Sequence, residues 1–463
     1  MSTAVAMPQS RTEGQRPGQY PDYRTTGLDW LSVIPQHWSM EKLKYIAQVQ
    51  FSNVDKKSED GEISVRLCNY VDVYYHDRIT SEIEFMEATA DPREITKFQV
   101  QPGDVLATKD SEDPNDICVP AVVGEPLPGV LCGYHLAQVR PLPGFSCGGY
   151  IMRAFASCGV RDQFRKRANG ITRFGLSQDA VCSALIPVPP LEEQEAIAEW
   201  LDDRTKRIDE LVAAKRRLIE LLAEQRKAII TNAVTKGLNT GVSMTPTGTD
   251  WLGSVPAHWA IKRIKFIAQV GNGSTPSREN PEYWGGEYPW LNSGVVNLRE
   301  VMEGADFVTD LALAECHLPR VQPPAVLVGI TGEGKTRGMA TVLRIEATIN
   351  QHLAFIRPRR TDCDVEFMRY VLQAAYQFLR DESGGGGSTK GALTCDQLGN
   401  VSVPFPPHSE QRAIATYLDA ASAKLDSLTA IAETVIARLT EYRQAVITAA
   451  VTGKIDVRKG VER

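Results

Sequence analysis

Hydrophobic residues recur in two different patterns along this chain, one typical of helices and one typical of strands. Residues 191–236 and 408–452 hold no glycine or proline, and their apolar residues recur every three or four positions, as on one face of a helix. Elsewhere, short apolar runs such as residues 63–75, 103–108 and 325–331 are broken by proline, glycine and aspartate turns, which is typical of strands. The pattern therefore predicts two long helices and two globular blocks of α+β structure.

The apolar positions of the two long helices predict that the helices pack together. They follow a heptad spacing with gaps at Arg204, Lys215 and Gln225, and the same register recurs 217 residues later. The expected seam consists of Leu201, Ile208, Leu211, Leu218, Leu222, Leu418, Leu425, Leu428, Val435 and Leu439. We expect an antiparallel coiled coil whose helices end at Gly237 and Gly453 as C-terminal caps. The alternative is that each helix packs only on its own globular block.

An internal repeat accounts for the two blocks and the two helices. Residues 27–49 and 248–270 are identical at 12 of 23 positions and share the motif D-W-L-x-x-x-P-x-H-W. Residues 186–209 and 403–426 share a proline pair, a Glu-Gln pair and a Leu-Asp pair. The repeat is too long for a solenoid, so it predicts a pseudo-two-fold molecule in which each copy is a globular domain followed by a long helix.

The repeat and the two periods together predict five segments. These are a disordered polar tail over residues 1–19, a first globular domain over 20–186, a central long helix over 187–242, a second globular domain over 243–403 and a C-terminal long helix over 404–463.

Composition narrows the class of protein. With 43% hydrophobic residues, no apolar run of membrane-spanning length and no signal-like start, the chain reads as a cytoplasmic globular protein. Nine scattered cysteines without a CxxC pair favour reduced thiols and no metal site. The net charge of −6 argues against a protein that holds nucleic acid by bulk charge alone, although locally basic loops remain compatible with it.

Several loops concentrate the residue types that contact nucleic acid. Cations reach phosphates, while amide and hydroxyl side chains read base edges. The candidate DNA-binding residues of the first block are Lys109, Arg165, Lys166, Arg167, Asn169, Thr172 and Arg173. Those of the second are Asn292, Lys335, Arg337, Ser388, Thr389 and Lys390. The alternative is that these loops are ordinary solvated turns.

One motif in the second block imitates a nucleotide-binding loop. Residues 329–336, GITGEGKT, match the pattern G-x-x-x-x-G-K-T letter for letter. That loop requires a helix directly after it, whereas MATVLRI (339–345) has the pattern of a strand. The sequence therefore favours a hairpin loop that carries Lys335 and Arg337 toward an anion. No catalytic motif such as HExxH or GxSxG is present, so we expect no catalytic residues.

The repeated motifs resemble those of the specificity (S) subunits of type I restriction–modification enzymes. The likeness lies in the duplicated D-W-L-x-x-x-P-x-H-W opening, in GSTPSRENPEYWGGEYPWLNSG (273–294) and in the signature [IV]P-x-PP-x-x-EQ-x-x-I-A-x-x-LD after each block. It covers about residues 20–455. The first block lacks the GSTP…PEYW stretch, which implies that the two blocks read different half-sites.

The resemblance implies a role in host defence and a set of partners. The chain would be a non-catalytic subunit whose two target recognition domains read a bipartite, asymmetric site on double-stranded DNA, while the helix pair fixes the gap. Two modification (methyltransferase) subunits would dock at the helices, near Glu193, Gln194, Glu410 and Gln411, and restriction (translocase/nuclease) subunits would complete the complex. S-adenosylmethionine, ATP and Mg would bind to those partners, and no cofactor or metal to this chain.

The residues themselves are also compatible with two other functions. One is a protein-only scaffold that carries two domains on a coiled coil, which the acidic net charge favours. The other is a nucleotide-binding protein that uses residues 329–336.

Overall fold

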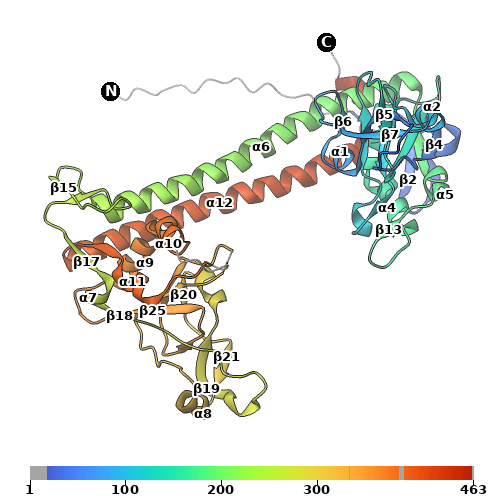
Figure 1. The fold of residues 1–463 in the computed structure, drawn as a ribbon. Coiled ribbons are helices and arrows are strands. Elements are labelled where there is room, and N and C mark those ends of the chain that lie inside the picture. Colours follow the sequence, from blue (N-terminus) through green and yellow to red (C-terminus); the bar gives the residue numbers. More distant parts are fainter. Residues whose placement is uncertain (1–17, 333, 385–390, 461–463) are drawn as a thin grey trace, which may run out of the picture. The chain divides into compact units, whose positions relative to one another are not determined.

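The computed structural model describes residues 18–332, 334–384 and 391–460 (Figure 1). The chain forms two compact units, the first from Met1–Lys215 with Thr434–Arg463 and the second from Arg216–Glu433. Each unit thus contains one globular block and parts of both long helices. The five segments expected from the sequence stay a prediction, and residues 1–17 of the expected tail lie outside the described residues.

The first unit is built on a five-stranded sheet of order β4-β12-β8-β10-β6. Neighbouring strands are antiparallel except β10 and β6, which are parallel. The strands of this unit are β1 (Tyr23–Leu28), β2 (Leu31–Pro35), β3 (Ser39–Lys42), β4 (Ala47–Phe51), β5 (Ile63–Cys68), β6 (Arg78–Ile79), β7 (Met86–Ala90), β8 (Val105–Thr108), β9 (Asp110–Ser111), β10 (Pro120–Val123), β11 (Val130–Cys132), β12 (Leu136–Pro141), β13 (Phe174–Gly175) and β14 (Leu185–Val188). Its short helices are α1 (Tyr70–Tyr75), α2 (Pro92–Phe98), α3 (Gly148–Ala156), α4 (Cys158–Arg167) and α5 (Gln178–Cys182).

The second unit repeats this sheet as β18-β25-β22-β23-β20, again with one parallel pair, β23 and β20. Its strands are β15 (Met244–Pro246), β16 (Ser254–Pro256), β17 (Ala260–Arg263), β18 (Ala268–Asn272), β19 (Trp284–Leu291), β20 (Glu300–Val301), β21 (Asp306–Val308), β22 (Ala325–Gly329), β23 (Ala340–Leu343), β24 (Thr348–Ile349), β25 (Leu353–Pro358) and β26 (Ser402–Phe405). Its short helices are α7 (Ile264–Ile267), α8 (Asp310–Glu315), α9 (Val365–Ala374), α10 (Tyr376–Glu382) and α11 (Cys395–Asn400).

The two sheets agree in register as well as in order. Ala47 of β4 pairs with Pro141 of β12, and Ala268 of β18 pairs with Pro358 of β25. These partners occupy matching positions in the sequence repeat. The internal duplication expected from the sequence is therefore confirmed at the level of strand pairing.

Two long helices, α6 (Leu191–Lys236) and α12 (His408–Val451), complete both hydrophobic cores. In the first unit, Leu201 from the start of α6 and Ile447 from the end of α12 belong to the same core. In the second unit, Val234 from the end of α6 joins Leu418 from the start of α12. The helices are therefore antiparallel, as expected. The alternative, in which each helix packs only on its own block, is wrong, because α12 also packs in the core of the first unit.

Burial along each long helix follows one unbroken heptad register, with steps of four and three residues. Every inward position is buried or half-buried. In α6 these positions are Leu201, Thr205, Ile208, Val212, Lys215, Ile219, Leu222, Arg226 and Ile229. In α12 they are Leu418, Ser422, Leu425, Thr429, Ala432, Ile436, Leu439, Arg443, Val446 and Ala450.

This register corrects part of the expected seam. Leu211, Leu218 and Leu428 are 52%, 39% and 41% exposed, so they flank the inward row, and Val435 lies half-buried beside it. The expected seam was assigned from leucine positions. The inward row instead includes polar residues such as Lys215, which the sequence suggested were gaps in the heptad pattern. The other expected seam residues, including Ile208, Leu222 and Leu439, do occupy inward positions.

The two inward arginines are each paired with an aspartate of the other helix, at equivalent positions of the repeat. Arg226 of α6 pairs with Asp426 of α12 in the second unit. In the first unit, Arg443 of α12 lies 3.0 Å from Asp209 of α6. Arg443 and Asp426 follow Arg226 and Asp209 by 217 residues each, so the two ion pairs are equivalents in the repeat.

Glycines end both helices as expected. Gly237 directly follows α6 with φ +74°, and Gly453 follows α12 with φ +69°. At Gly237 the amide donates to the carbonyl of Ala233 at 3.1 Å, which closes the last turn. Within the described part of the chain, no helix is both long and apolar enough to cross a membrane.

The register predicts unequal effects for two neighbouring leucines of α6. Leu222→Ala removes a side chain that is 7% exposed, and we expect it to cost about 2–5 kcal/mol of unfolding free energy. Leu218→Ala is the matched control, and its cost is expected to stay within about 1 kcal/mol. Urea unfolding of the full chain measures both. Equal losses for the two variants would contradict the register.

Candidate nucleic-acid interface

A buried carboxylate connects the start of α6 to the repeated H-W motif of the first unit. Glu193 lies 2.8 Å from His37 Nε2 and accepts hydrogen bonds from Tyr20 OH at 2.5 Å and from Trp38 Nε1 at 3.2 Å. Burial, and after it the Glu193 carboxylate, raises the pKa of the Tyr20 phenol, so that Tyr20 remains a donor. The motif therefore serves to anchor the helix to the globular block.

The second unit repeats this anchor in a weaker form. Glu410 lies 2.9 Å from His258 Nε2, as Glu193 does from His37. The indole of Trp259 is buried, but its Nε1 has no hydrogen-bond partner among the described residues. Glu410 is also more exposed than Glu193. The same motif thus stabilises the first unit more than the second.

The glutamine that follows each of these glutamates holds the loop before a short helix. Gln194 donates to the carbonyls of Phe145 and Pro189 and accepts from the amide of Cys147. Gln411 makes the equivalent bonds to the carbonyls of Asp362 and Pro406 and to the amide of Asp364. Both side chains are buried and fully engaged.

These contacts bear on the docking role expected for Glu193, Gln194, Glu410 and Gln411. Glu193, Gln194 and Gln411 are buried inside their own units and have internal partners, so they offer little surface to another protein. In the structure these Glu-Gln pairs hold each long helix to its own globular block. Their role in docking another subunit stays a prediction.

In the first unit, two of the expected DNA-binding segments come together. Strands β9 and β13 pair, with Phe174 opposite Ser111 and Gly175 opposite Asp110. Arg173 Nε donates to Asp110 Oδ1 at 3.1 Å, and the amide of Leu176 donates to the carbonyl of Lys109 at 2.9 Å. The 169–175 loop is therefore fixed beside the end of β8.

The tip of the 169–175 loop is exposed and tightly closed. Gly170 has φ +146°, and a Cβ at this position would lie 1.9 Å from the carbonyl oxygen of Arg173. Only glycine fits there without a shift of backbone. The turn leaves Ile171 93% exposed and Thr172 exposed next to Arg173. Asn169 pairs with Gly175 through both backbone groups, at 3.0 and 2.8 Å.

The basic run before this loop lies at the end of α4. Arg165 contacts Asp162 at 3.4 Å and donates to Asn115 Oδ1 at 3.2 Å, while Arg167 donates to Ser183. Lys166 is exposed. These cations crowd the C-terminal end of the helix, where the dipole favours positive charge.

Lys109 differs from the other candidates because it is half-buried. Its Nζ donates to the carbonyl of Ser52 at 2.9 Å and lies 4.3 Å from the ring centroid of Tyr134. Burial lowers the pKa of the Lys109 ammonium, and the Asp110 carboxylate opposes that shift. Lys109 therefore positions the loop base and has less freedom to reach a ligand than Arg173.

In the second unit, Lys335 and Arg337 lie on the loop between β22 and β23, which are antiparallel neighbours. The predicted hairpin is therefore confirmed, and the helix that a phosphate-binding loop needs is replaced by a strand. Lys335 is exposed, whereas Arg337 is 9% exposed and its Nε has no hydrogen-bond partner among the described residues.

The remaining candidates of the second unit are separate from this loop. Asn292 is exposed and caps the short 3₁₀ helix Ser293–Asn297, where its side chain accepts from the amide of Gly294 at 2.8 Å. Ser388, Thr389 and Lys390 lie outside the described residues.

Sequence reasoning missed a histidine in each unit. His135 Nδ1 lies 2.8 Å from Asp110 Oδ2, and His352 Nδ1 lies 2.6 Å from Thr331 Oγ1. The signal was present, because the motif H-L-A-x-x-R-P begins at both histidines. The two histidines hold equivalent loops with different partners, a carboxylate in one unit and a hydroxyl in the other.

Aromatic side chains of the second unit form a separate cluster around Arg278. The guanidinium lies 3.8 Å from the ring centroid of Trp284, and Trp290 Nε1 donates to the carbonyl of Ser274 at 3.0 Å. This packing orders the GSTP…PEYW stretch. In the described ranges, no group of three His, Cys, Asp or Glu side chains lies close enough to hold a metal ion.

The sequence of this chain is similar to those of known proteins. Residues 256–438 match the family described as type I restriction modification DNA specificity domain. The type I restriction enzyme MjaX specificity subunit of Methanocaldococcus jannaschii is 24% identical over 92% of this chain and 96% of its own length. The EcoKI specificity subunit of Escherichia coli K12 is 22% identical over 44% of each chain.

Two solved structures share the fold. A chain from a study of complex assembly and conformational transition of the type I R-M system has a TM-score of 0.70 at 18% identity, covering 91% of this chain and 99% of that chain. The crystal structure of the HsdS subunit from Thermoanaerobacter tengcongensis has a TM-score of 0.53 at 19% identity, covering 91% and 98%.

The unequal anchors lead to a prediction. Glu193→Ala leaves two buried donors, Tyr20 OH and Trp38 Nε1, without an acceptor, and we expect it to cost about 3 kcal/mol or more of unfolding free energy. Glu410→Ala is the matched control and is expected to cost about 1 kcal/mol, since solvent already reaches that carboxylate. Denaturant unfolding monitored by tryptophan fluorescence measures both. A larger loss for Glu410→Ala would contradict the contacts described for Glu193.

Proposed function

We propose that this chain, which belongs to the family of type I restriction–modification specificity subunits, selects the DNA sequence on which a restriction–modification complex acts. It would read a bipartite, asymmetric site with two different recognition domains. The chemistry would be carried out by other subunits.

The observation that carries this proposal is a duplicated sheet with dissimilar loops. The amides of Leu176 and Leu393 donate to the carbonyls of Lys109 and Ile330, so the same loop junction occurs in both units. Beside these junctions the side chains differ: His135 lies against the carboxylate of Asp110, whereas His352 lies against the hydroxyl of Thr331. An equal backbone with unequal contact residues suits a target with two different halves.

The proposed base contacts come from the exposed tips. In the first unit, Arg173 and Thr172 supply a guanidinium and a hydroxyl, and Asn169 lies at the same turn. In the second unit, Lys335 and Asn292 are exposed. Arg165, Lys166 and Arg167 would contact phosphates, because they form a cationic run rather than a shaped tip. Arg337, Ser388, Thr389 and Lys390 complete the proposed set.

The proposed partners follow from the family. Two modification subunits would dock on the helix pair and supply adenine methylation with S-adenosylmethionine. Restriction subunits would supply translocation and cleavage with ATP and Mg. The net charge of −6 supports a subunit that shares phosphate contacts with such partners instead of binding DNA alone.

The direct test is to map N6-methyladenine across the host genome with and without this chain, in the presence of its modification partners. Loss of methylation at one gapped, asymmetric motif on deletion supports the proposal. Methylation that is unchanged by the deletion would leave a protein-only scaffold as the better explanation.

Single loop variants should affect one half of the motif at a time. Arg173→Ala is expected to weaken discrimination in one half-site and Lys335→Ala in the other, by about 1–3 kcal/mol for each lost base contact. Arg320→Ala, at a 57% exposed position away from the helix pair, is the control and should leave both halves unchanged. Binding of the assembled complex to single-base variants of the motif gives the measurement. An equal loss at both halves would argue against one domain per half-site.

A further inference from the structure

Asp77 in the first unit and Arg299 in the second occupy equivalent positions of the repeat. The amide of Val122 in β10 donates to the carbonyl of Asp77 at 3.0 Å, and the amide of Val342 in β23 donates to the carbonyl of Arg299 at 3.4 Å. Asp77 directly precedes β6, and Arg299 directly precedes β20, its equivalent. A carboxylate in the first unit is therefore replaced by a guanidinium in the second.

In the first unit, Asp77 is the shared counter-ion of two arginines. Its Oδ2 lies 3.0 Å from Arg153 Nη1 on α3 and 2.6 Å from Arg443 Nη2 on α12. Gln444 lines the same small cavity, whose volume is about 210 Å³. The Asp77 carboxylate thus balances the positive charges that α3 and α12 bring together.

In the second unit, the same arginines recur without that counter-ion. Arg226 is the repeat equivalent of Arg443, and Arg369 follows a methionine on α9 as Arg153 does on α3. Arg299 extends to Asp419 of α12 at 2.8 Å. Lys227 replaces Gln444. Exchange of a carboxylate for a guanidinium adds two positive charges, and exchange of an amide for an ammonium adds a third.

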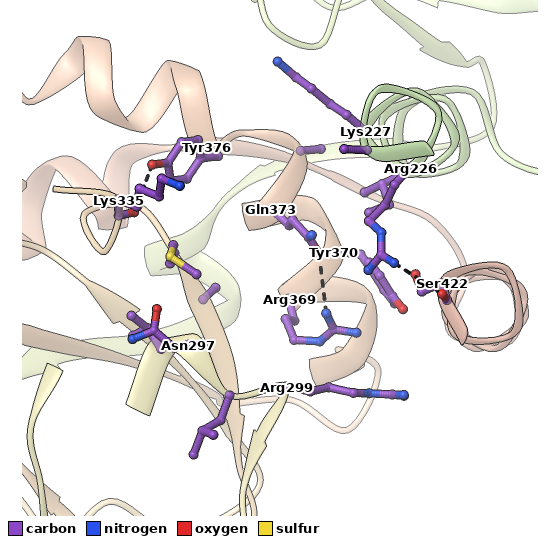
Figure 2. A pocket seen from close by; sticks show the side chains of 18 of the residues that line it. Arg226, Lys227, Asn297, Arg299, Lys335, Arg369, Tyr370, Gln373, Tyr376 and Ser422 are labelled. Atoms are coloured by element: carbon purple, nitrogen blue, oxygen red, sulfur yellow. Dashed lines mark hydrogen bonds between the residues drawn. The ribbon is translucent and has the colours of Figure 1, made fainter. Parts of the chain in front are cut away.

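A cavity of about 680 Å³ lies at this place in the second unit (Figure 2). Five cations line it. The one lining carboxylate, Asp426, pairs with Arg226, while Arg299 and Arg369 contact Asp419 and Glu366 outside the lining. The cations are Arg226, Lys227, Arg299, Lys335 and Arg369. Lys227 and Lys335 have no ion pair with any described residue. Excess positive charge in a cavity raises the local concentration of anions.

Arg369 is the buried member of this set. It is 7% exposed, and its Nη2 has no hydrogen bond among the described residues, although the Asp419 carboxylate lies 3.5 Å away. That carboxylate already receives Arg299 and the hydroxyl of Tyr370, the latter at 2.7 Å. A buried guanidinium with a spare donor costs free energy unless an acceptor reaches it.

We propose that this cavity binds a phosphate group carried by a small molecule of about nucleotide size. The phosphate would supply the negative charge that Asp77 supplies in the first unit. Arginine forks match phosphate oxygens, and the five cations outnumber the three carboxylates that contact them, Asp419, Asp426 and Glu366. The volume lies within the range of small-molecule sites and leaves room beside a phosphate, where Asn297, Gln373 and Tyr376 line the wall.

The test uses the full-length chain without DNA, so its outcome does not depend on the proposed function. Isothermal titration calorimetry would measure binding of adenosine monophosphate, inorganic phosphate and succinate. We expect adenosine monophosphate to bind about tenfold more tightly than phosphate, and succinate to bind more weakly than either.

Two variants restore features of the first unit. Arg299→Asp introduces a carboxylate at the position of Asp77 and should weaken adenosine monophosphate about tenfold or more. Lys227→Gln copies Gln444 at an exposed helix position and should weaken it severalfold. Arg320→Asp is the control, because it makes the same charge change at an arginine that is 57% exposed, as Arg299 is.

Binding weakened by Arg299→Asp and by Lys227→Gln but unchanged in Arg320→Asp supports the proposal. Lys227→Gln keeps the test decisive if Arg299→Asp fails to fold. Three results would overturn it: no binding of adenosine monophosphate, binding that all three variants retain, or succinate bound as tightly as the phosphates, which would favour an acidic side chain of a partner.

Discussion

The antiparallel packing of α6 and α12 is the constraint on which the rest of the structure depends. Each helix supplies core residues to both units, so neither block can be completed by its own half of the chain. The inward rows are not purely apolar. Arg226 and Arg443 lie in these rows and pair with aspartates of the opposite helix. These pairs favour one register over its neighbours, since a shift would leave a half-buried arginine without its aspartate.

This constraint explains why the two halves kept the same backbone while their surfaces diverged. Strand order, register and the glutamine that holds the loop before α3 or α9 are common to both units. The differences are single side chains on this shared framework: Asp77 against Arg299, Lys109 against Ile330, and Asp110 against Thr331. Recognition residues can change in this way without a loss of fold, because the shared core bears the stability.

Much of the architecture could be read from the sequence because it rests on local patterns. The uninterrupted helical period predicted α6 and α12, Gly237 and Gly453 predicted their ends, and the strand-like run after Lys335 predicted a hairpin. The inward row of the helix pair could not be fully predicted. Thr205, Lys215 and Arg226 face inward because of how the partner helix packs, and that packing is not visible in a local pattern. The anchor around Glu193 was missed for a similar reason: Tyr20, His37 and Trp38 come from more than 150 positions away. His135 and His352 are marked in the sequence by the repeated motif H-L-A-x-x-R-P.

We propose that the helix pair sets the separation of the two half-sites, and a matched deletion tests this. Along α6, residues 214–220 lie between Asp209 and Arg226, and along α12, residues 432–438 lie between Asp426 and Arg443. Each range is one heptad, and the two ion pairs that flank it are kept. The variant lacking both would be expressed with its modification partners, and N6-methyladenine mapped by sequencing. We expect unchanged half-sites with a different gap between them. Methylation at the original gap would contradict the claim.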